Sequence, residues 1–128
     1  MEQAMPRLHK WIGAALGAAA FAAPPVLAHH SFAMFDTREQ VTLSGTVREF
    51  QWTNPHSWLQ LEVARGGATV EYSIELGSPN TMWRRGWRRT TFKPGDQVTV
   101  TMNPMRDGSP GGALVTAIDA QGNRLSMR

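Results

Sequence analysis

Five short segments of alternating apolar and polar residues constrain the fold of this chain more than any other feature. In residues 41–49, for example, Val41, Leu43 and Val47 alternate with polar neighbours. Alternation with a period of two is typical of strands that bury one face. The other four segments are residues 59–63, 70–76, 98–102 and 114–118, separated by turn-forming stretches such as Thr53-Asn54-Pro55, Gly66-Gly67 and Lys93-Pro94-Gly95-Asp96. We therefore expect five strands.

A short helix is predicted between the third and the fourth strand. Ser78 is a favourable N-cap, and Pro79 suits the first helical position. Gly86 suits the position just after a helix, where the backbone is often left-handed. Trp87 follows it, and in that frame its side chain is expected to pack back onto Met82.

Three strands, a helix and two strands follow the element order of the OB-fold, a five-stranded Greek-key barrel. The first strand of such a barrel bends so that it serves both sides, and Gly45 is expected at the bend. The predicted fold class is therefore all-β with one short helix, arranged as a small five-stranded OB-like barrel. Another small barrel or a sandwich of the same strands is the alternative, because alternation does not reveal strand order.

Residues 1–28 have the pattern of a cleavable export signal. A basic start precedes the uncharged apolar run at residues 11–23, and small or modest residues end the segment at Ala28. The run is shorter than the roughly 20 residues that span a bilayer, so no transmembrane anchor is expected after processing. The predicted organisation is a signal peptide at residues 1–28, an N-terminal arm at 29–40 and the barrel domain at 41–128, in a periplasmic or secreted protein.

The amino-acid composition excludes several kinds of metal site and catalytic site. The chain has no Cys, which excludes disulfides, thiolate metal sites and cysteine nucleophiles. Eleven basic and nine acidic residues remain once residues 1–28 are removed, so the mature domain is only mildly cationic. The sequence contains no Gly-x-Ser-x-Gly elbow, no phosphate-binding glycine loop and no zinc-protease helix. A binding module is therefore favoured over an enzyme.

Three histidines of the mature chain are the candidate metal ligands. His29 and His30 open it, and His56 lies in the Asn-Pro-His turn between the first two strands. Cleavage after Ala28 gives His29 a free α-amine beside its imidazole, and a second histidine then completes the nitrogen-rich site, a histidine brace, that suits Cu(II). Zinc is the less favoured metal, and Asp36 or Glu75 could add a carboxylate. The alternative is that the terminal histidines are solvated and that His56 caps a turn or packs against a tryptophan.

Candidate partner-binding residues form two further groups. Arginines and tryptophans interleave in residues 83–89, and an exported protein of this kind is expected to meet an anionic envelope component and no nucleic acid. The favoured structural interpretation is that Trp83 and Trp87 pack on the barrel while the arginines point to water. The first group is Arg84, Arg85, Arg88 and Arg89; the second is Trp52, Trp58 and Tyr72, expected on one barrel face that could bind a glycan, a lipid or a protein.

Several motifs together resemble a known family. They are His29-His30-Ser31-Phe32, Phe35-Asp36, Gly45-x-Val47, Trp52-x-Asn54-Pro55-His56, Arg85-Gly86-Trp87, Gly95-Asp96-x-Val98 and Pro104-x-x-Asp107-Gly108. This constellation is similar to the domain-of-unknown-function family 6152 of secreted proteobacterial proteins. The resemblance implies a periplasmic small β-domain and no particular activity.

The sequence thus predicts a periplasmic module that binds or delivers a divalent metal, with copper favoured, through His29, His30 and His56. A metal-free envelope interaction module is the alternative. A histidine-brace copper oxidase is the least favoured interpretation, because a small barrel offers no evident broad substrate surface.

Overall fold

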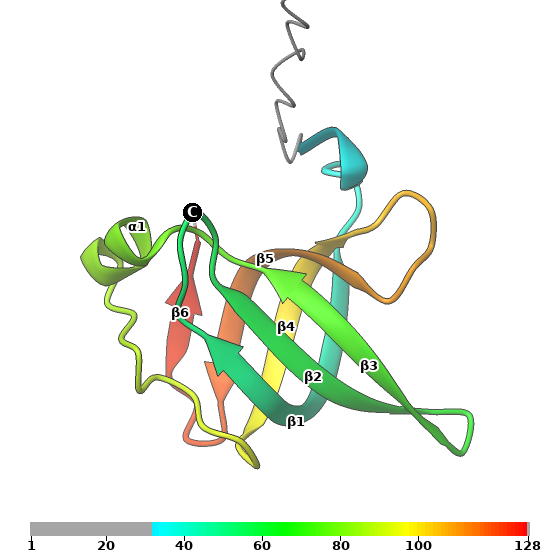
Figure 1. Ribbon diagram of the computed structural model, residues 1–128. Helices are drawn as coiled ribbons and strands as arrows, with labels where there is room; N and C mark the ends of the chain where they lie inside the picture. The colour runs from blue at the N-terminus through cyan, green and yellow to red at the C-terminus, as the bar shows by residue number, and fades with distance from the viewer. Residues whose placement is uncertain (1–31, 128) are drawn as a thin grey trace, which may run out of the picture.

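The computed structural model describes residues 32–127, and the alternating segments form strands in it as predicted (Figure 1). The elements in chain order are η1 (Phe32–Met34), β1 (Val41–Gln51), β2 (Trp58–Arg65), β3 (Ala68–Glu75), α1 (Pro79–Arg84), β4 (Gln97–Pro104), β5 (Gly111–Asp119) and β6 (Arg124–Ser126). The predicted signal peptide at residues 1–28 lies outside the described residues. Within residues 32–127, no helix is both long and apolar enough to cross a membrane.

The strands close into the predicted OB-like barrel. Their order is β3-β2-β1-β4-β5-β6, and a parallel pairing of β3 with β5 joins the two sides. The first strand serves both sides: residues 41–46 pair with β4, and residues 46–51 pair with β2. A Cβ added at Gly45 would lie 2.6 Å from the Glu62 carbonyl oxygen, so glycine permits the close approach of β1 and β2. The register shift itself lies slightly later, between Val47 and Glu49.

One edge of β5 is shared between two strands. Residues 111–113 pair with β3, and residues 116–118 pair with β6. Beyond β6, the Met127 N–H donates to the Val115 carbonyl oxygen at 3.0 Å. β3 ends at Glu75, so Leu114 lies between the residues of β5 that pair with β3 and those that pair with β6.

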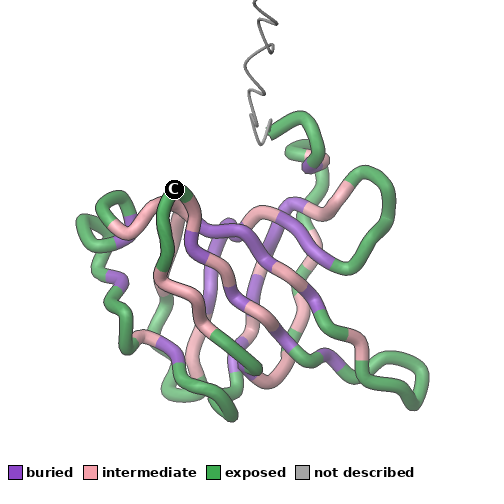
Figure 2. The backbone as a smooth tube through the Cα atoms, in the orientation of Figure 1, coloured by how far each residue is buried: buried purple, intermediate pink, exposed green. Residues whose placement is uncertain are grey.

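Inward-facing residues of every barrel strand form one core. Figure 2 shows buried positions along the strands of the barrel. Leu59, Ile74 and Val100 are fully buried, as are Met82 of α1 and Trp87 just after it. Phe50, Trp52, Trp87 and Phe92 form a group of aromatic rings whose neighbouring centroids lie 5.9–6.3 Å apart. A fully buried large aromatic side chain contributes about 3–5 kcal/mol relative to alanine, so the tryptophan that follows α1 is a major anchor of the helix.

The ends of α1 form as predicted. The Thr81 N–H donates to Ser78 Oγ, and Gly86 has the left-handed φ of 88° expected after a helix. The N–H groups of Gly86 and Trp87 donate to the carbonyl oxygens of Trp83 and Met82, at 3.1 Å each, which completes a Schellman motif. One prediction is wrong: Trp83 does not pack on the barrel, since it is 57% exposed.

Candidate functional site

A row of outward-facing residues crosses four strands near one end of the barrel. Trp58 of β2 lies opposite Glu75 of β3, Glu75 lies beside Ala113 of β5, and Ala113 lies opposite Asn103 of β4. The residues next to them, such as Leu59, Ile74 and Met102, belong to the core, so the row faces away from it. Because Ala113 has only a methyl side chain, the middle of the row is hollow.

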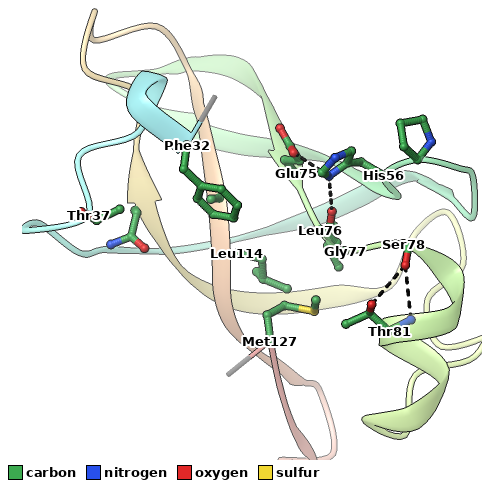
Figure 3. A pocket seen from close by; sticks show the side chains of 13 residues that line it. Phe32, Thr37, His56, Glu75, Leu76, Gly77, Ser78, Thr81, Leu114 and Met127 are labelled. Carbon is green, nitrogen blue, oxygen red and sulfur yellow. Dashed lines mark hydrogen bonds and ion pairs between the residues drawn. The ribbon is translucent and has the colours of Figure 1, made fainter. Parts of the chain in front are cut away.

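The hollow forms part of a cavity of about 490 Å³ (Figure 3). Its walls come from the arm before β1, the turn between β1 and β2, the end of β3, the start of α1, and β4, β5 and the C-terminal segment. The lining residues are Phe32, Thr37, Pro55, His56, Glu75, Leu76, Gly77, Ser78, Thr81, Asn103, Ala113, Leu114 and Met127. Figure 1 shows η1 and α1 at this end of the barrel.

Backbone hydrogen bonds hold His56 at the cavity wall. The Ser57 N–H donates to the Gly77 carbonyl oxygen at 3.0 Å, and the Leu76 N–H donates to the Ser57 carbonyl oxygen at 2.9 Å. The Thr53 hydroxyl donates to the carbonyl oxygen of His56 itself at 2.8 Å. These bonds attach the turn between β1 and β2 to the segment that leaves β3, so the imidazole has a defined position.

The His56 imidazole and the Glu75 carboxylate face each other (Figure 3). His56 Nδ1 lies 2.7 Å from Glu75 Oε1 and 3.3 Å from the Leu76 carbonyl oxygen. Both neighbours are hydrogen-bond acceptors, so Nδ1 carries the hydrogen. In the neutral imidazole this assignment leaves the lone pair on Nε2, the arrangement that metal-binding histidines with a carboxylate partner adopt.

Glu75 is the most unusual group of the cavity. Its side chain is only 7% exposed, and Oε2 is buried with no hydrogen-bond partner among residues 32–127. An unsatisfied buried acceptor is costly, and a charged one more so. The carboxylate therefore has capacity for a further donor or cation.

The arm before β1 is attached to the loop between β4 and β5. Arg106 donates from its backbone N–H to the Met34 carbonyl oxygen at 2.9 Å and from Nε to the Ala33 carbonyl oxygen at 2.8 Å. The Asp36 N–H donates to the Pro104 carbonyl oxygen at 2.8 Å, and Phe35 is buried. These contacts fix Phe32, the first described residue of the arm, beside the cavity.

Asp36 and Glu75 were both predicted as carboxylates that could join a metal site, and their surroundings differ. The Asp36 carboxylate accepts hydrogen bonds from the Arg38 guanidinium and backbone, which lower its pKa to about 2. Arg106 Nη1 lies 3.8 Å from it as well. Glu75, in contrast, has a buried oxygen with no partner in the described part of the chain. The structure thus brings Glu75 and not Asp36 to His56.

The predicted histidine trio is described only in part. His29 and His30 lie outside the described residues, and His56 lies on the cavity. Residues 32–127 contain no group of three or more histidine, aspartate or glutamate side chains that could hold a metal ion by themselves.

The aromatic residues predicted for one barrel face do not share a face. Tyr72 is 6% exposed and belongs to the core, because it lies opposite Leu61 on the inward side of β3. Trp52 packs against the core from its edge, and Trp58 belongs to the outward row. Alternation along β2 and β3 separates Trp58 from Tyr72, so this predicted binding face is wrong. The predicted arginines, Arg84, Arg85, Arg88 and Arg89, are all exposed around the end of α1.

The part of the cavity wall around Asn103 was not predicted from the sequence. Asn103 is 5% exposed, and its amide donates to the Glu39 carbonyl oxygen at 2.6 Å. The available signal was the run Gly111-Gly112-Ala113, since successive small residues in a strand indicate close backbone approach or a hollow. Cβ atoms added at Gly111 and Gly112 would lie 2.5 and 2.4 Å from backbone oxygens.

Comparisons with known proteins give a family and one similar structure. The mitochondrial single-stranded DNA binding protein Rim1 of S. cerevisiae is similar in structure, with 14% sequence identity and a TM-score of 0.48 over 66% of this chain and 97% of that one. No curated protein matches the sequence. A family model described as a family of unknown function, DUF6152, matches residues 17–115, which confirms the resemblance seen in the motifs. Since this match covers well over half of the 128 residues, the chain belongs to DUF6152.

Proposed function

We propose that the mature protein is a small periplasmic module that binds or delivers a divalent metal, with copper favoured and His29, His30 and His56 as ligands. Cleavage after Ala28 is part of the proposal, because only then does His29 offer both an α-amine and an imidazole. Nitrogen ligands in such a set suit Cu(II), and zinc is the less favoured metal.

The observation that carries the proposal is the bond from His56 Nδ1 to the buried Glu75 carboxylate. Histidines that bind metals almost always donate their other ring N–H to a carboxylate, a carbonyl or water, which fixes the tautomer and makes the ligand nitrogen more basic. Here Nδ1 faces both a carboxylate and a carbonyl oxygen. In this proposal, Glu75 is a positioning residue that fixes the orientation of the His56 ring.

The charge of Glu75 also favours a cation. Within residues 32–127, the ion pairs of arginine involve Asp36 and Glu71, and none reaches Glu75. A divalent cation bound by His56 would offset part of the cost of burying this carboxylate.

Chain connectivity supports a contribution from the terminal histidines. Phe32 lines the same cavity as His56, and only Ser31 separates Phe32 from His30. Two extended residues span about 7 Å. The proposal therefore includes the two histidines that precede Phe32 in the sequence as ligands of the metal on His56.

The test uses protein purified after export, with His29 verified as the first residue by intact mass. Cu(II) is titrated while the electron paramagnetic resonance spectrum and the heat of binding are recorded. We expect a tight site with nitrogen couplings, weakened at least 100-fold by His56→Ala and about 10- to 100-fold by Glu75→Gln, the range seen for partners of metal-bound histidines. Thr37→Ala, an exposed cavity residue, is the matched control and keeps the affinity.

A second preparation carries an additional Met before His29, which blocks chelation by the α-amine. The proposal is wrong if this extension and His56→Ala both leave the copper affinity unchanged. If only the extension has no effect, His56 and Glu75 remain a metal site but the chelating role of His29 is rejected.

A further inference from the structure

Exposed cations gather around the C-terminal end of α1. Arg84, Arg85, Arg88 and Arg89 are all exposed, and Trp83 is 57% exposed among them. We call these five residues the arginine–tryptophan surface. Residues 79–95 contain no aspartate or glutamate, and Lys93 adds a further exposed cation.

The exposed indole of this surface is held in place. The Arg88 guanidinium lies over the Trp83 ring, 3.8 Å from its centroid, which is a favourable cation–π distance. Arg88 Nη1 also donates to the carbonyl oxygens of Trp83 and Trp87, at 3.1 and 2.7 Å. Because Trp87 is fully buried, Arg88 and Trp83 are tied to the core and present a preorganised surface.

The positive charge of the surface is not neutralised within the described chain. Elsewhere in residues 32–127, several arginines have polar partners: Arg38 pairs with Asp36, Arg48 pairs with Glu71, and Arg65 donates to Tyr72. Among the described residues 32–127, no ion pair involves Arg84, Arg85, Arg88 or Arg89. An unneutralised cluster of this kind favours an anionic partner.

We propose that the arginine–tryptophan surface docks the protein on a bilayer that contains anionic phospholipids. Guanidinium groups bind phosphate through paired hydrogen bonds, and tryptophan favours the level of the lipid headgroups. A single-stranded nucleic acid fits less well, because it requires successive aromatic platforms for its bases. Only Trp83 of the two tryptophans in this segment is exposed, since Trp87 is 0% exposed.

The test is sedimentation of the exported protein with vesicles of phosphatidylglycerol and phosphatidylcholine, compared with vesicles of phosphatidylcholine alone. We expect binding only to the anionic vesicles. The triple variant Arg84→Gln, Arg85→Gln, Arg89→Gln is expected to bind roughly 100-fold more weakly, from the typical effect of each basic residue near an anionic surface. Arg88 is left unchanged because its side chain bonds to the backbone.

The matched control, Arg38→Gln, Arg48→Gln, Arg65→Gln, removes the same amount of positive charge elsewhere. Its vesicle binding is expected to weaken by less than a tenth of the factor seen in the triple variant. Trp83→Ala should weaken vesicle binding and abolish a blue shift of tryptophan fluorescence on binding. Copper affinity is expected to be unchanged in the triple variant, which separates this surface from the proposed metal site.

The proposal is overturned by equal binding to both kinds of vesicle, by equal losses in the triple and control variants, or by arginine-dependent binding of a thymidine oligonucleotide without vesicle binding. A salt titration of the unmodified protein serves if the triple variant does not fold. Vesicle binding must fall as NaCl rises from about 0.15 M to about 1 M, where the Debye length shrinks from about 8 to about 3 Å. Salt-independent binding also contradicts docking by charge.

Discussion

Asp36 attaches the arm through its charge as well as through its backbone. Hydrogen bonds from Arg38 are the main cause of its low pKa of about 2, and Arg106 adds a longer attraction. The ordinary value is 3.8, so the folded state binds this proton less readily than the unfolded chain does. The stabilising contribution is therefore complete above pH 3.8 and is lost as the pH falls through about 2.

Because the pKa of Asp36 is lower in the folded state, the protein should lose stability as this carboxylate is protonated. Asp36→Asn should reduce the loss of unfolding free energy on acidification from pH 3.8 to about 2, measured by urea denaturation at each pH. Arg38→Gln should move the carboxyl pKa of Asp36 up toward 3.8, as followed by NMR titration. An Asp36 pKa that stays near 2 in Arg38→Gln contradicts Arg38 as its main cause.

At the scale of the elements, the close approach of β4, β5 and β3 depends on glycines without side chains. A Cβ added at Gly112 would lie 2.4 Å from the Asn103 carbonyl oxygen, a backbone atom that cannot turn away. We predict that Gly112→Ala lowers the unfolding free energy by about 1–3 kcal/mol, the usual cost of overpacking. Gly77→Ala is the control, because its Cβ would meet the flexible end of Met127. Equal stability of Gly112→Ala and the unmodified protein in urea denaturation contradicts this account.

The secondary-structure elements differ in how far the sequence predicts them. Alternation located all five barrel strands, because each buries one face. Two features depend on contacts that alternation does not report. The three-residue β6 is defined only by its pairing with residues 116–118 of β5, far from any local signal. Trp83 and Trp87 stand four residues apart and would share a helix face, but α1 ends at Arg84 and the left-handed Gly86 turns the chain between them.

At the scale of the whole molecule, barrel closure assembles the candidate site from distant segments. His56 precedes β2, Glu75 ends β3, and Phe32 comes from the arm before β1. The sequence identifies His56 and Glu75 as chemically capable residues, because imidazole and carboxylate groups are metal ligands. Their 2.7 Å contact follows from the register that sets Trp58 opposite Glu75 and from the bonds of Ser57 to the segment after β3. Alternation does not reveal strand order, so the contact between His56 and Glu75 could not be predicted from the sequence.

Because the site is assembled only in the folded protein, metal binding must raise the stability of the whole domain. A ligand that binds only the folded state at about 100 times its Kd stabilises it by about 2.7 kcal/mol, and about 1 kcal/mol shifts the Tm of such a small domain by several degrees. We predict that Cu(II) raises the Tm of the exported protein by about 10 °C or more, measured by calorimetry, whereas Mg²⁺, which prefers oxygen ligands, leaves it unchanged. His56→Ala should remove most of the rise and Thr37→Ala should retain it. The same rise in His56→Ala means that His56 is not a ligand of the copper that stabilises the fold, because loss of a ligand weakens the site and must lower the rise.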